Sequence, residues 1–78
     1  PSSSLILYQE NGGDLLISTP EASLLTQVQV FDLRGKLIAL SKDPSSIQRI
    51  PRHQLPAGIY LIRAFDDEQI QTGKIVIH

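Results

Sequence analysis

Residues 55–63 read LPAGIYLIR, so a proline and a glycine stand directly before an apolar run. The fixed φ of proline suits the second position of a type I turn and glycine suits the fourth, which predicts a turn ahead of a central strand. A tyrosine follows two residues after the glycine. In an immunoglobulin-like sandwich, a tyrosine at this place donates a hydrogen bond to the upstream backbone and holds the corner between the sheets. The stretch therefore predicts a structural corner made by Leu55, Pro56, Gly58 and Tyr60.

The rest of the chain has the period of strands rather than of helices. Val28 and Val30 alternate with Gln27 and Gln29, which is the pattern of a half-buried antiparallel strand. Only residues 20–25 could hold a short turn of helix. The apolar runs predict seven strands: Leu5–Gln9, Leu15–Thr19, Thr26–Asp32, Lys36–Ser41, Ser46–Ile50, Ile59–Phe65 and Gln69–Ile77. Seven short strands separated by turns are typical of an all-β fold, an immunoglobulin-like antiparallel β-sandwich.

Length and composition limit the class of protein. The 78 residues suffice for one small domain, and 41% hydrophobic with 19% charged residues is the composition of a folded chain. The formal net charge of −1 argues against a nucleic-acid-binding module, and no apolar run approaches the roughly 18 residues of a transmembrane segment. Because the sequence has no methionine, Pro1 is not a translation start. Residues 1–4 are expected to end a linker, and residues 5–78 to form the domain.

Groups suited to catalysis or metal binding are sparse, and the sequence predicts no enzyme, no cofactor and no metal site. His53 and His78 belong to no nucleophile motif and are too few for zinc. The acidic run 66–68 lacks the alternating spacing of a calcium loop and is interpreted as a solvated hairpin turn. Arg49, Arg52 and His53 either form a small cationic patch for an anionic partner or keep an edge strand or loop soluble, and the second interpretation is favoured.

A second well-marked turn joins two of the predicted strands. The Asp32 carboxylate can accept a backbone N–H at the first turn position and Gly35 suits the fourth, which predicts a hairpin. Three motifs then follow in order: VQVFDLRGKLI (28–38), LPAGIYLIRAF (55–65) and TGKIVIH (72–78). Each motif alone is common. In this order, over residues 14–78, they resemble the C-terminal sorting domain of type IX secretion cargo, the type A sorting domain of the Por secretion system.

The resemblance implies a non-catalytic C-terminal signal domain that directs its parent protein through the type IX secretion system of Bacteroidetes. It implies export through the periplasm to the outer-membrane surface or into the medium. The implied partners are the translocon or shuttle proteins of the outer membrane, a surface sortase and anionic lipopolysaccharide. The expected recognition elements are the hairpin and the terminal strand, with the residues Asp32, Arg34, Gly35, Lys36, Gly73, Lys74, Ile75, Val76, Ile77 and His78.

Two alternatives stay open. Many members of that family carry a Pro-Asn-Pro segment before the first strand, whereas residues 5–14 here read LILYQENGGD. Because of this departure, cleavage of the domain and its retention at the surface are both open. In the other alternative, the chain is an accessory immunoglobulin-like module of a surface protein that binds glycan or protein, or spaces domains. A glycan site would need an exposed aromatic platform, and the chain has only the aromatic residues Tyr8, Phe31, Tyr60 and Phe65.

Overall fold

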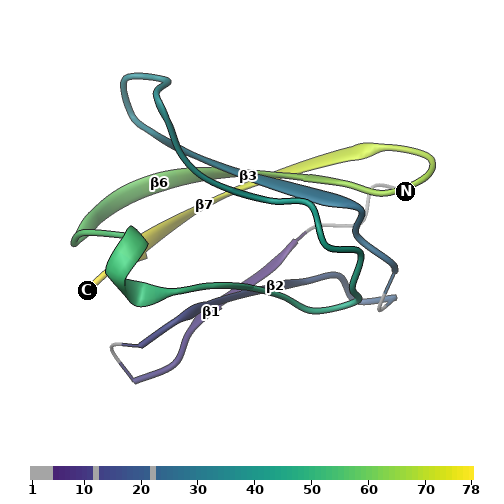
Figure 1. Ribbon diagram of the computed structural model, residues 1–78, viewed down its shortest axis with the longest axis horizontal. Coiled ribbons are helices and arrows are strands. Elements are labelled where there is room, and N and C mark those ends of the chain that lie inside the picture. Colours follow the sequence, from purple (N-terminus) through teal and green to yellow (C-terminus); the bar gives the residue numbers. More distant parts are fainter. Residues whose placement is uncertain (1–4, 12, 22) are drawn as a thin grey trace.

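The computed structural model describes residues 5–11, 13–21 and 23–78, in which two antiparallel sheets face each other (Figure 1). One sheet has the strand order β1–β2–β5 and the other β4–β3–β6–β7. The strands are β1 (Ile6–Gln9), β2 (Leu15–Ser18), β3 (Gln27–Asp32), β4 (Leu37–Ser41), β5 (Gln48–Ile50), β6 (Gly58–Phe65) and β7 (Ile70–Ile77). The predicted all-β sandwich of seven strands is confirmed, with strand ends shifted by one or two residues. The expected linker, residues 1–4, lies outside the described residues.

The core lies between the two sheets and is built from alternate residues of the strands. Successive side chains of a strand point to opposite faces, so β2, β3, β5 and β6 bury alternate residues. On β3, Val28 and Val30 are fully buried, whereas Gln27 and Gln29 are not. A fully buried side chain of this size contributes about 1.5–3 kcal/mol through the hydrophobic effect. The buried apolar residues are Leu15, Ile17, Leu25, Val28, Val30, Ala39, Ile50, Leu55, Tyr60, Ile62, Ala64 and Ile77.

The short β3–β4 hairpin decides which sheet the fourth strand joins. In the constant-type immunoglobulin arrangement, the fourth strand belongs to the same sheet as the first, second and fifth strands. Here β4 pairs with β3, because residues 33–36 are too few to carry the chain across the sandwich. The β3–β4 register shifts between Val30 and Phe31, which is a bulge. The larger sheet therefore has four strands, with β4 and β7 at its edges.

The chain passes from β5 to β6 through a short 3₁₀ helix and a hydrogen-bonded corner. The helix η1 (Arg52–Gln54) has only one turn, and the hydrophobic periodicity did not predict it. After it the chain bends at Ala57, and β6 begins at Gly58, whose φ of 156° is rarely adopted by L residues. The buried Tyr60 donates its hydroxyl hydrogen bond to the carbonyl oxygen of Pro56, at 2.5 Å. The phenol therefore ties the start of β6 to the bend before it.

We predict that Tyr60→Phe lowers the free energy of unfolding by about 1 kcal/mol, because it removes one intramolecular hydrogen bond and leaves the Pro56 carbonyl unpaired at the corner. Equilibrium urea unfolding of both forms measures the difference. Tyr8→Phe is the matched control, since Tyr8 is 55% exposed on β1. Equal stabilities of Tyr60→Phe and the parent chain would show that the corner bond adds nothing.

Candidate functional site

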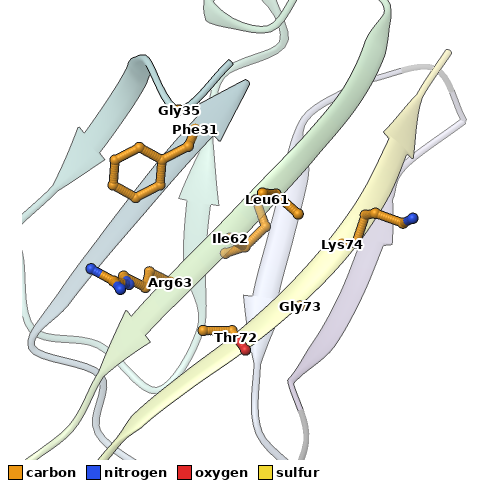
Figure 2. A pocket seen from close by; sticks show the side chains of 8 residues that line it. All are labelled: Phe31, Gly35, Leu61, Ile62, Arg63, Thr72, Gly73 and Lys74. Carbon is orange, nitrogen blue, oxygen red and sulfur yellow. The ribbon is translucent and has the colours of Figure 1, made fainter. Parts of the chain in front are cut away.

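The β3–β4 hairpin and the terminal strand border the same hollow on the outer face of the four-stranded sheet (Figure 2). The hollow is open to solvent and has a volume of about 630 Å³. Gly35 contributes from the hairpin, while Gly73 and Lys74 contribute from β7. Its full lining is Phe31, Gly35, Leu61, Ile62, Arg63, Thr72, Gly73 and Lys74. The two elements that the sequence singles out for recognition thus meet around one surface, across β6.

The hollow has an apolar floor with a cation on either side. Phe31 lies opposite Leu61 in the β3–β6 pairing, and Leu61 lies opposite Lys74 in the β6–β7 pairing. Leu61 is 41% exposed, so the apolar outer face of β6 is uncovered. Arg63 and Lys74 make none of the ion pairs found among the described residues, and no carboxylate is among the lining residues. This combination suits an apolar surface that carries negative charge.

The hairpin is held by the carboxylate of Asp32. Its Oδ1 atom accepts the backbone N–H groups of Arg34 at 2.9 Å and Lys36 at 3.0 Å. The Asp32 backbone N–H donates to the Lys36 carbonyl oxygen, and the Asp32 carbonyl oxygen accepts the Gly35 N–H. Gly35 has a φ of 86°, which favours glycine. The bond from the Lys36 N–H holds the pKa of Asp32 below its ordinary value, with further help from Arg34. Asp32 and Gly35 therefore shape the loop, while the side chains of Arg34 and Lys36 stay exposed.

The predicted recognition residues of the terminal strand divide between the two faces of the sheet. Lys74 and Val76 are exposed on the outer face, whereas Ile75 is half-buried and Ile77 is buried on the inner face. A Cβ atom at Gly73 would lie 2.9 Å from the Cδ1 atom of Leu7, so glycine here permits close packing of β1 against β7. Part of the predicted set is therefore occupied in packing, and the outward residues are the accessible ones.

Three side-chain hydrogen bonds hold the backbone of His78. The Gln9 carboxamide accepts the His78 N–H at 3.0 Å and donates to the His78 carbonyl oxygen at 3.1 Å. The Arg52 guanidinium donates to the same carbonyl at 3.1 Å. Sequence reasoning did not find these contacts, because Gln9 lies 69 positions away and no periodic signal joins the two residues. The end of the terminal strand is thus fixed from β1 and from η1.

Arg49, the other arginine of the RIPRH stretch (49–53), forms ion pairs within the domain. Arg49 pairs with Glu10 at 2.8 Å and with Asp14 at 3.2 Å, so it is not a free cation on an edge strand. The Asp14 carboxylate accepts the backbone N–H of Arg52 at 2.9 Å. That bond, followed by the Arg49 side chain, holds the pKa of Asp14 below its ordinary value. The Arg49 side chain and the Arg52 backbone thus connect β5 and η1 to the β1–β2 turn, while the Arg49 side chain stays 54% exposed on the edge strand.

The acidic run after β6 forms a hydrogen-bonded turn. In the β6–β7 turn, Asp66 Oδ1 accepts the backbone N–H groups of Glu68 and Gln69, both at 2.8 Å. The described parts of the chain contain no cluster of three or more histidine, cysteine or acidic side chains that could hold a metal ion. The same described ranges hold no helix of the length and hydrophobicity required to cross a bilayer.

We predict that Asp32→Asn weakens the dependence of stability on pH in acid. The asparagine oxygen can still accept the loop N–H groups but cannot ionise. The folded pKa of Asp32 lies below its ordinary value of 3.8, so its stabilising contribution is present above pH 3.8 and is lost as the pH falls through the folded pKa. When thermal unfolding is measured from pH 5 downward, the melting temperature should therefore fall less steeply in the variant than in the parent chain. Asp67→Asn in the exposed β6–β7 turn is the control, and an unchanged pH profile in Asp32→Asn contradicts the assignment.

A comparison with protein-family models identifies a family for most of the chain. The chain matches the secretion system C-terminal sorting domain over residues 11–78, a range that includes both elements around the hollow, whereas β1 precedes it. A search of curated proteins finds no match. A domain of this family is a sorting signal, typically non-catalytic, and implies export from the cell and interaction with secretion machinery. Together with the confirmed β-sandwich, the match shows that the chain belongs to the family of secretion system C-terminal sorting domains.

Proposed function

We propose that this domain directs its parent protein through the type IX secretion system, across the outer membrane and to the cell surface. The observation that carries the proposal is the meeting of the β3–β4 hairpin and β7 around one hollow. Recognition of a folded domain requires a surface on which residues far apart in the sequence lie together. The hollow provides such a surface on rigid, paired strands rather than on a loose terminus.

The chemistry of the hollow supports a protein of the outer-membrane translocon, or a shuttle protein, as the partner. Interface centres are apolar and aromatic, while charges fix orientation and suppress wrong partners. Leu61 and Phe31 supply the apolar part, and Arg63 and Lys74 supply the charge. A partner that reads this surface would therefore present an apolar patch with carboxylates near its rim.

The packing of β1 limits where a surface sortase could act. Leu7 packs against Gly73, and Gln9 binds the backbone of His78, so β1 is part of the folded domain. A cut that releases an intact domain would fall before Leu5. The other open outcome is that the domain is retained at the surface, which follows if the parent protein is not cut there.

The positions of the aromatic residues favour this proposal over a glycan-binding module. Tyr60 is buried in the core, and Tyr8 is exposed on β1 in the opposite sheet. Phe31 lines the hollow, and Phe65 is partly covered at the end of β6. Sugar stacking needs aromatic faces that are exposed together, and these four residues do not gather on one face.

Fusion of residues 1–78 to a periplasmic reporter in a type IX-competent host tests the proposed function. The parent fusion should reach the cell surface, and a fusion that ends before Gly73 should not. The double variant Arg63→Glu, Lys74→Glu should lower surface delivery by at least about tenfold, equivalent to ~1.4 kcal/mol, because it places like charges against the partner.

Lys42→Glu is the matched control, since Lys42 is exposed outside the hollow. Circular dichroism and thermal unfolding of the purified domains would show that the charge variants fold. If the parent fusion fails to reach the surface, the proposed function is overturned. If the double variant is delivered as well as the parent, the placement of recognition in the hollow is overturned.

A further inference from the structure

β7 is the least protected of the four edge strands. Natural sheets blunt their edges with short strands, prolines, bulges or charges, because unpaired N–H and C=O groups attract further strands. β1 has four residues and β5 has three, with Pro51 directly after it. β4 pairs with its neighbour through a bulge. β7 has eight residues, an unbroken register with β6, no proline and Lys74 as its one charged residue, and no strand among the described residues pairs with its other edge.

The register shows which backbone groups point to that open edge. At the β6–β7 turn the Asp66 N–H donates to the Gln69 carbonyl at 3.1 Å, which closes a hydrogen-bonded pair. Hydrogen-bonded and non-hydrogen-bonded pairs alternate along an antiparallel ladder, so Gln71, Gly73, Ile75 and Ile77 bond β6. The residues between them direct both backbone groups away from β6: Ile70, Thr72, Lys74 and Val76.

The fold itself already uses this edge at its far end. His78 continues the same alternation, and both its N–H and its carbonyl oxygen are bound by the Gln9 carboxamide. A carboxamide carries both an N–H donor group and a carbonyl acceptor, as the peptide units of a neighbouring strand do. Gln9 thus closes the edge at His78, beyond the last residue of β7.

Two side chains on β7 have no polar partner within the described part of the chain. Gln71 is 6% exposed, and neither its Oε1 nor its Nε2 atom has a hydrogen-bond partner, an unfavourable state for a buried amide. Lys74 makes none of the ion pairs among the described residues. A strand laid beside β7 would place side chains opposite both residues, a polar one toward Gln71 and a carboxylate toward Lys74.

We propose that an extended segment of a secretion-machinery protein adds to β7 as a further antiparallel strand, with an acidic side chain opposite Lys74 and a polar one opposite Gln71. This inference rests on the proposed function and specifies how the partner binds. A second copy of this chain is disfavoured, since two-fold pairing through the middle of β7 sets the Lys74 ammonium groups opposite or diagonal to each other. Apolar residues on the partner would extend the outer face beside Ile70 and Val76, which are 55% and 47% exposed.

Amide hydrogen exchange of the purified 78-residue chain, followed by NMR, tests whether the edge is open. The amides of Thr72, Lys74 and Val76 should exchange on the order of tenfold or more faster than those of Gly73 and Ile75, which bond β6. Equal protection of the two sets overturns the inference, because the edge would then already be occupied.

Proline substitution in the reporter fusion tests strand addition in the cell. Thr72→Pro removes a donor at the open edge and no bond to β6, so it should keep the unfolding midpoint while surface delivery falls by at least about tenfold relative to Thr72→Ala. Val76→Pro serves in the same way if Thr72→Pro is unstable. Asp67→Pro, at the second position of the β6–β7 turn, is the proline control and should be delivered normally.

Each outcome of the delivery experiment decides the question. If both proline variants fold but lose surface delivery, the result supports strand addition. Delivery of Thr72→Pro equal to that of Thr72→Ala overturns it while the proposed function stands, and unfolding of both proline variants overturns the assigned register. If the parent fusion itself stays in the periplasm, the proposed function fails, and this inference fails with it.

Discussion

The hydrogen bond from Tyr60 to Pro56 fixes the strand around which the rest of the domain is arranged. β6 begins at this corner and pairs with β3 along one edge and with β7 along the other. β3 leads directly into the hairpin, and β7 is the terminal strand. Both proposed recognition elements therefore take their positions from β6, and a shift of its register by one residue would exchange its buried and exposed faces. In the proposed function, the corner acts by positioning these elements and does not itself contact the partner.

Charge is distributed unevenly over the domain. The carboxylates of Glu10, Asp14 and Asp32 are engaged by arginine side chains or by loop N–H groups, and the acidic run after β6 forms a turn. Arg63 and Lys74 lie beside an apolar floor and take part in none of the ion pairs found among the described residues. A chain with a net charge of −1 thus presents a local positive, apolar surface, which its overall charge does not reveal.

Sequence reasoning succeeded where the signal is local. The alternation in residues 27–30 and the turn chemistry of Asp32 and Gly35 are contained in a few neighbouring residues, and they predicted the strands and the hairpin. The helix η1 was missed because a single turn has no periodicity. The Arg49–Asp14 and Gln9–His78 contacts join residues 35 and 69 positions apart, and only the folded chain brings them together. The pairing of β7 with β6 determines which residues of the terminal strand face the core and which face outward. The order of strands in the sheet leaves one edge of β7 open.

We propose that the secretion machinery binds the outer face of the four-stranded sheet. Site-specific photo-crosslinking tests it most directly, with the cross-linking amino acid placed at Leu61 in the hollow or at Tyr8 on the opposite sheet of a reporter fusion. Position 61 should cross-link to an outer-membrane component of the type IX system, whereas position 8 should not. Cross-linking at position 8 with none at position 61 would contradict it.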